Sequence, residues 1–184
     1  MSVRDTIARL LGRLWRGRRG AAAVELAFVA PLLIAFTAGI FEVIFIAYDY
    51  NLASEATRRG LRVAVLQPPV GTITGIDTTP VVCTSAGGAS CTGGALSSGA
   101  TFNAVVAAIQ AIKPNVAAAN VQVTYSTSGL DDPVAGPGII TPLITVRLIG
   151  LSYNFQLLAV VPGMPTRFDF PAFTASAIGP SQSS

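Results

Sequence analysis

The sequence predicts an α+β protein in which a long N-terminal transmembrane helix precedes a small antiparallel sheet domain with one covering helix. Of its 184 residues, 51% are hydrophobic and only 11% are charged, and the longest apolar run lies near the N-terminus. Short runs in which apolar and polar residues alternate follow from residue 121 onward. We therefore divide the chain into a basic leader (1–20), a long helix (21–66) and an α+β domain (67–184).

The charged residues are distributed unevenly. Residues 1–20 hold six arginines and one aspartate, a net charge of +5, whereas residues 21–184 hold six basic and eight acidic residues, a net charge of −2. The chain has no histidine and two cysteines, so it lacks the commonest general base and the ligands of an ordinary zinc site. It also lacks a phosphate-binding glycine motif, a nucleophile elbow and a basic stripe for nucleic acid. We expect no enzyme activity, catalytic residue, cofactor, metal or nucleic-acid partner.

The apolar run between residues 26 and 48 is long enough to cross a membrane. As a helix it spans about 35 Å, against a hydrocarbon core of about 30 Å. Thirteen Leu, Ile, Val or Phe residues between Leu26 and Ile46 outweigh the cost of one acid, Glu42. Pro31 is expected to bend or loosen one turn. A cleaved secretory signal is disfavoured because the run is too long and no small-residue cleavage site follows it, and a twin-arginine export signal because the run is too apolar.

Arginines ahead of the apolar run set its expected orientation. Six of them precede it, whereas Arg58, Arg59 and Arg62 follow only at a distance. An excess of positive charge marks the cytoplasmic side of a membrane segment. We therefore expect a cytoplasmic leader and an extracytoplasmic C-terminal domain.

The junction between leader and helix has the layout of a type IV prepilin: basic residues, then Gly20, then an apolar helix with Glu25 at its fifth position. A cut after Gly20 would make Ala21 the new N-terminus. Because a carboxylate in an apolar helix is costly, it is usually functional, and the new amine would supply the opposite charge in the same chain or a neighbour. The alternative is that Glu25 merely lies at the membrane interface.

The N-terminal third of the chain resembles the TadE/TadG-like minor pseudopilins of the tight-adherence (Tad) type IV pilus system. The residues that carry the resemblance are RGAAAVELA (19–27), PLL (31–33), GIFE (39–42) and NLASEATRRGLRVA (51–64). By this resemblance, the dedicated prepilin peptidase of the system cuts between Gly20 and Ala21, and Glu25 sets helix register during assembly. Major pilins of these systems usually carry an aromatic residue where this chain has Leu26, and the longer C-terminal domain is typical of a minor component.

The helical pattern continues through residues 49–66, where Glu55 has basic residues at i+3 and i+4, and Pro68 and Pro69 then forbid its continuation. One helix over 21–66 would be about 69 Å long. Small residues recur at helical spacing and favour close packing between helices, although alanine is also simply abundant here. These pairs are Ala23/Ala27, Ala35/Gly39 and Ala56/Gly60.

Residues 71–100 are rich in Gly, Ser and Thr and predict a loop or loose hairpin. Within them, Cys83 and Cys91 are expected to form a disulfide in an oxidising compartment, which would stabilise the domain by about 2–3 kcal/mol. A redox-active pair is disfavoured because the spacing is not that of a C-x-x-C motif.

The rest of the chain predicts one helix and several strands. Apolar residues recur at three and four over 101–112, which predicts an amphipathic helix that Pro114 ends. Gly150 suggests a tight turn or a bulge, residues 131–138 form a turn-rich connection, and Arg147 either faces solvent or pairs with Asp169. The apolar residues of the alternating runs are Val121, Val123 and Tyr125; Ile144, Val146 and Leu148; Tyr153, Phe155 and Leu157; and Phe173, Ala175 and Ala177.

The function implied by the resemblance is support of assembly or initiation of a Tad-type adhesive pilus. The expected partners are the prepilin peptidase, other pilins or pseudopilins, the inner-membrane assembly platform and membrane lipid, and the expected location is the bacterial inner membrane. The alternative is an unprocessed, single-pass structural protein of an envelope complex. A tethered hydrolase is a third class, in which Asp131 and Asp132 would be the carboxylate pair, but adjacent acids before a proline usually only solvate a turn.

Overall fold

In the computed structural model, the described residues are 18–74, 76, 78–85, 87–129, 139–160, 163–180 and 182–183. Contacts divide the chain into two units. We call Met1–Phe45 with Phe155–Thr166 the stalk unit, and Ile46–Asn154 with Arg167–Ser184 the sheet unit.

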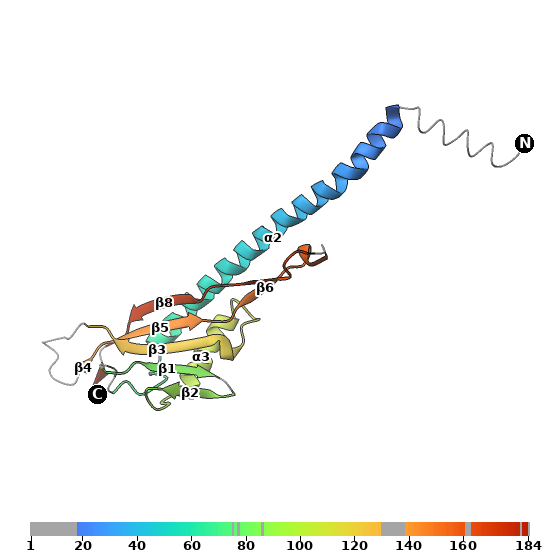
Figure 1. The fold of residues 1–184 in the computed structure, drawn as a ribbon. Helices are drawn as coiled ribbons and strands as arrows, with labels where there is room; N and C mark the ends of the chain where they lie inside the picture. The colour runs from blue at the N-terminus through green and yellow to red at the C-terminus, as the bar shows by residue number, and fades with distance from the viewer. Residues whose placement is uncertain are drawn as a thin grey trace, which may run out of the picture. The chain divides into compact units, whose positions relative to one another are not determined.

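One helix, α2 (Arg18–Leu66), contributes to both units (Figure 1). The long helix expected for residues 21–66 is therefore present, and it begins three residues earlier. It continues through Pro31. It ends shortly before Pro68 and Pro69, because proline has no backbone N–H for the helical ladder and its ring disfavours a helical residue before it.

The sheet unit contains a five-stranded antiparallel sheet in the order β2-β1-β3-β5-β8 (Figure 1). Two further antiparallel pairs are short: β4 with β9, and β6 with β7. The bounds are β1 Val81–Ser85, β2 Ala89–Thr92, β3 Val121–Thr127, β4 Ile139–Ile140, β5 Pro142–Leu148, β6 Ser152–Asn154, β7 Arg167–Asp169, β8 Phe173–Ile178 and β9 Gln182–Ser183.

The core of the sheet unit lies on one face of the sheet, where α3 (Gly99–Gln110) and the C-terminal part of α2 supply buried side chains. Along β3 and β5, buried residues alternate with more accessible ones, as the period of a strand requires. Ser98, the residue before α3, caps the helix, because its hydroxyl accepts the N–H of Thr101 at 3.2 Å. The predicted α+β class with a covering helix is confirmed. In this unit α2 buries mainly small side chains, namely Ala53, Ala56, Gly60 and Ala64.

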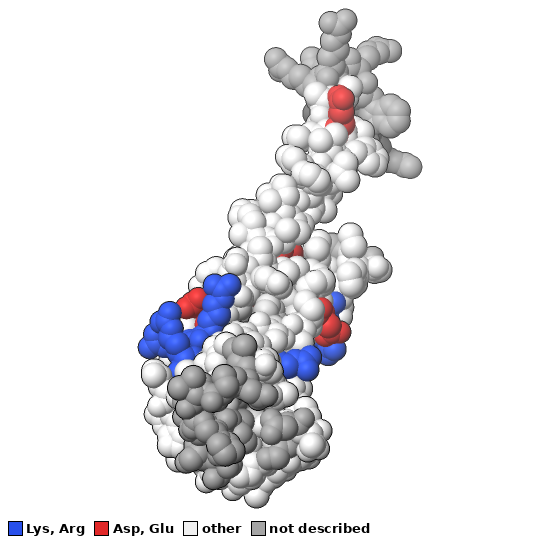
Figure 2. All heavy atoms as spheres, turned by 90° about the vertical axis from the view of Figure 1, so that its left-hand side faces the viewer, with Lys and Arg blue, Asp and Glu red and all other residues white. Residues whose placement is uncertain are grey.

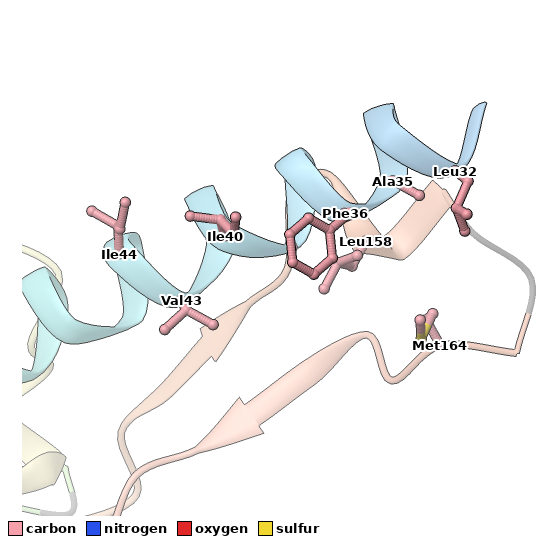
Figure 3. Close-up of a pocket in the computed structure, with 9 residues that line it drawn as sticks. Leu32, Ala35, Phe36, Ile40, Val43, Ile44, Leu158 and Met164 are labelled. Atoms are coloured by element: carbon pink, nitrogen blue, oxygen red, sulfur yellow. The ribbon is translucent and has the colours of Figure 1, made fainter. Parts of the chain in front are cut away.

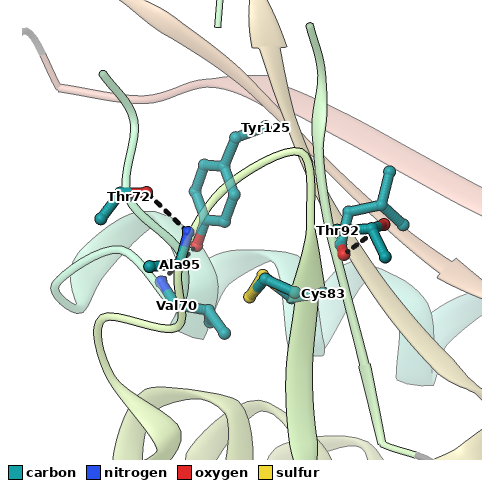
Figure 4. Close-up of a disulfide and its surroundings, with 8 residues drawn as sticks. Val70, Thr72, Cys83, Thr92, Ala95 and Tyr125 are labelled. Atoms are coloured by element: carbon teal, nitrogen blue, oxygen red, sulfur yellow. Dashed lines mark hydrogen bonds between the residues drawn. A yellow bond between two sulfur atoms is a disulfide. The ribbon is translucent and has the colours of Figure 1, made fainter. Parts of the chain in front are cut away.

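A disulfide between Cys83 and Cys91 joins β1 to β2 across the hairpin, as the sequence predicted (Figure 4). Beside it, the hydroxyl of the buried Tyr125 on β3 accepts the backbone N–H of Val70 at 3.0 Å. This bond ties the segment that follows α2 to the middle of the sheet. Burial raises the pKa of Tyr125 above its ordinary value near 10, although the bond from Val70 acts in the opposite direction.

Two secondary-structure predictions differ from the structure. The strand expected over Tyr153, Phe155 and Leu157 is wrong beyond residue 154, because β6 ends at Asn154 and the following residues belong to the stalk unit. The predicted helix over 101–112 is present as α3 but ends at Gln110. Gly150, where we expected a tight turn or a bulge, lies between β5 and β6 with a φ of +66°, a conformation that glycine adopts without strain.

The charged residues of the second half take the following places. Arg147 is exposed, and Asp169 pairs instead with Arg167, Nε to Oδ1 at 2.7 Å, on the surface. Asp131 and Asp132, with the whole of the turn-rich connection over 131–138, lie outside the described residues.

Candidate functional site

The predicted processing site lies in the first turns of α2. Gly20 lies two residues after Arg18, where the described helix begins, and Ala21 is exposed. Glu25 lies four residues after Ala21, on the same side of the helix, since residues four apart are neighbours on a helix surface. An amine created at Ala21 would therefore stand one turn from this carboxylate.

Glu25 is exposed and forms no ion pair with any residue that the structure describes. It lies on a helix whose surface is otherwise apolar over residues 24–45, and Figure 2 shows this part of α2 with few charged side chains. A carboxylate in such a place gains from an opposite charge brought close to it. The geometry thus leaves Glu25 accessible to a positive group of a neighbouring chain.

The stalk part of α2 exposes large apolar side chains all around the helix. Such a surface is not stable in water and marks contact with lipid or with other apolar helices. The helix is long and apolar enough to serve as a single-pass membrane anchor. The exposed apolar side chains between residues 24 and 45 include Phe28, Leu32, Ile34, Phe36, Ile40, Phe41, Val43 and Phe45.

A second acid of this segment, Glu42, has a partner that the sequence did not predict. Its side chain is fully buried, and its Oε1 accepts the backbone N–H groups of Gln156 at 2.6 Å, of Leu157, and of Leu158 at 3.3 Å. The last of these donors is the first residue of the short helix η2 (Leu158–Val160), and the first N–H groups of a helix have no partner within it. Glu42 therefore acts as a cap for a segment more than a hundred residues away.

Residues 155–166, which we call the apolar loop, form the rest of the stalk unit. Their sequence, FQLLAVVPGMPT, contains no charged residue. The backbone N–H of Phe155 donates to the carbonyl of Thr166 at 3.0 Å and closes the base of the loop. Gly163, with a φ of +87°, supplies a conformation that favours a reversal of the chain.

An apolar groove of about 610 Å³ lies between the apolar loop and α2 (Figure 3). The helix contributes residues from Leu32 to Ile44, and the loop contributes Leu158 and Met164. In Figure 3 the side chain of Met164 points from the loop toward the helix. No charged side chain lines the groove.

The pairs of small residues on α2 have different surroundings. Gly60 lies against α3, since a Cβ placed on it would be 2.7 Å from Cγ1 of Ile109. Ala35 and Gly39 line the groove, and a Cβ on Gly39 would meet nothing within 4 Å. One pair thus serves packing inside the sheet unit, and another remains open in the stalk unit.

Metal ligands do not gather in the described part of the chain. Over these residues no group of three or more His, Cys, Asp or Glu side chains is placed to hold a metal ion. Both cysteines are bonded to each other.

Among the described residues, one helix is long and apolar enough to cross a membrane, and one comparison matches most of this helix to a family model. Residues 20–62 match the family model described as TadE-like protein. The matched range of this chain includes Gly20, Glu25, Glu42 and Gly60. The predicted resemblance is confirmed over these residues, and the match supports a component related to the Tad pilus. No curated protein and no solved structure matches the chain.

Proposed function

We propose that this protein is a minor pilin-like component, a pseudopilin, that supports assembly or initiation of a Tad-type adhesive pilus. The observation that carries the proposal is the TadE-like helix, on which Glu25 lies exposed at the fifth position after Gly20. In this proposal the chain is held in the bacterial inner membrane, with the leader in the cytoplasm and the sheet unit on the far side. The prepilin peptidase removes residues 1–20.

The proposed mechanism is mechanical. Removal of the leader creates an ammonium group on Ala21, and this group pairs with Glu25 of its own chain or of a neighbour. Such an ion pair is favourable in an apolar setting only when close contact compensates for its desolvation. It therefore stabilises packed helices only in the register that brings the ammonium group and the carboxylate together. The apolar side chains of α2 then contact the helices of other pilins or pseudopilins, and the sheet unit presents a folded domain next to the assembly platform.

The test is co-expression of the full chain with a prepilin peptidase of a Tad system, followed by intact-mass measurement. We expect a mass loss equal to residues 1–20, and Gly20→Leu should abolish it. Gly39→Leu is the matched control, since a side chain begun there meets open space, and it should be processed normally. An unchanged mass in the native chain would contradict the proposal and favour the unprocessed envelope protein.

A second variant separates processing from assembly. Glu25→Gln keeps the size of the side chain but removes its charge, so we expect normal cleavage together with loss of co-purification with other pilins of the system. Co-purification at the level of the native chain would show that the carboxylate has no part in helix register, even where cleavage occurs.

A further inference from the structure

We propose that the apolar loop is a second membrane-embedded element, which enters the hydrocarbon of the bilayer beside α2 and is held there by Glu42. The occupant of the groove between loop and helix is, in this proposal, the acyl chains of membrane lipid. The inference requires only that α2 spans a membrane, so it does not depend on the pilus function proposed above.

The first argument is the depth of Glu42. It lies six residues before the end of the apolar run at residue 48, which is about 9 Å along the helix axis. The carboxylate therefore lies within the apolar stretch rather than at its edge. The segment that it binds has to be at the same depth, because three backbone N–H groups of that segment lie within hydrogen-bonding distance of one oxygen.

The second argument is that the Glu42 carboxylate and the backbone N–H groups of the apolar loop satisfy each other's hydrogen-bonding capacity. Backbone that is not helical or in a closed barrel is tolerated in hydrocarbon only where its polar groups find partners within the protein. The carboxylate satisfies the donors of residues 156–158, which lead into η2. The same donors satisfy a fully buried carboxylate that would otherwise be costly in a membrane helix.

The third argument is composition. The apolar loop has no charged residue, and Leu157 and Met164 leave 45% and 48% of their surface exposed, which hydrocarbon would cover. Charge returns at Arg167, immediately after the loop, where it forms its exposed ion pair with Asp169. The uncharged stretch therefore coincides with the loop and ends where the chain returns to the sheet unit.

The fourth argument is reach. The base of the loop is closed at Phe155 and Thr166, and half of a twelve-residue segment spans at most about 20 Å when fully extended. The helix side of the groove runs from Leu32 to Ile44, about 18 Å. The loop is therefore of the right length to follow α2 within the leaflet that adjoins the C-terminal end of the span.

The test measures the depth of single tryptophans in the full chain, reconstituted in phosphatidylethanolamine and phosphatidylglycerol vesicles with or without brominated acyl chains. Trp15 is the only tryptophan, so Trp15→Phe provides the background. Into it we introduce Leu157→Trp in the loop, Phe28→Trp on the exposed face of α2, and Leu96→Trp in the sheet unit. Leu96 is the matched control because it is 43% exposed, nearly the same as Leu157.

We expect brominated lipid to quench the fluorescence of the Leu157→Trp chain nearly as strongly as that of the Phe28→Trp chain. The Leu96→Trp chain should be unquenched by lipid but open to iodide. In the Leu157→Trp chain, Glu42→Leu removes the acceptor of three backbone donors, so we expect iodide quenching in place of lipid quenching. Glu42→Gln keeps an acceptor oxygen, so we expect lipid quenching to remain. The Cys83–Cys91 disulfide, measured by non-reducing mass spectrometry, verifies that the sheet unit of each variant is folded.

Three results would overturn the inference. If lipid quenches the Phe28→Trp chain while iodide quenches the Leu157→Trp chain, the anchor is intact and the loop is in water. If the tryptophan of the Leu157→Trp chain is shielded from both quenchers, another protein segment, and not lipid, occupies this surface. If Glu42→Leu leaves lipid quenching of the Leu157→Trp chain unchanged, Glu42 does not hold the loop in the bilayer.

Discussion

Gly60 is the point at which α2 approaches α3 most tightly, and replacing it by alanine tests the packing of the sheet unit. In an open helix, Gly→Ala gains about 0.5–1 kcal/mol. Here the new Cβ would lie 2.7 Å from Cγ1 and 2.8 Å from Cδ1 of Ile109, which is fully buried and cannot move aside freely. Overpacking of a core costs about 1–3 kcal/mol, so we expect a net loss of about 1 kcal/mol.

The assay is urea unfolding of the full chain in detergent, followed by near-ultraviolet circular dichroism, which reports packing of the tyrosines and phenylalanines. Gly39→Ala is the control, because its Cβ meets open space and it should cost nothing. Ile109→Val removes one of the two crowding atoms and should cost less in the Gly60→Ala chain than in the native chain, where it costs about 0.5–1.5 kcal/mol. A Gly60→Ala chain as stable as the native one would refute the close approach.

Two further groups of the sheet unit give predictions in the same assay. Tyr125→Phe leaves the buried N–H of Val70 without its acceptor and should cost about 1–3 kcal/mol. Because burial raises the pKa of Tyr125 in the folded state, that state keeps a proton that the unfolded state loses, so stability should fall as pH rises above 10, and less steeply in Tyr125→Phe. Asp49→Ala leaves the largely buried Lys113 without its ion-pair partner and should cost about 1–3 kcal/mol, whereas Asp169→Ala, at an exposed pair, should cost less than about 1 kcal/mol.

The elements that the sequence predicted well are those whose signal is local. The apolar length of α2 and the proline pair after it fix both ends of that helix closely. Val121, Val123 and Tyr125 alternate because only one face of β3 is buried, and that alternation is visible without any knowledge of the partner strands. The pairing order of the strands depends on contacts between distant residues, and for that reason it could not be derived.

The strand predicted through Phe155 and Leu157 shows where local pattern is insufficient. The alternation of apolar residues there continues that of β6, so it favours a strand. The chain instead turns its backbone donors toward Glu42, a residue 114 to 116 positions earlier. The periodicity of apolar residues does not reveal such a contact. The signal that could have revealed it is the cost of a carboxylate within an apolar helix, which we set against the apolar residues around Glu42 without expecting a partner.

The two acids of the stalk unit impose different conditions on the proposed assembly. Glu25 is exposed and accessible to a positive group, whereas the buried Glu42 is already satisfied by donors of its own chain. Helices that pack onto α2 can therefore gain from a contact at Glu25, but they gain nothing at Glu42 and would lose by displacing the apolar loop, since that leaves a buried carboxylate without its donors. Packing around the N-terminal turns of α2 is compatible with both acids. Packing over the groove between Leu32 and Ile44 would require the loop to leave, which makes the groove side of α2 the less favourable face for a neighbouring subunit.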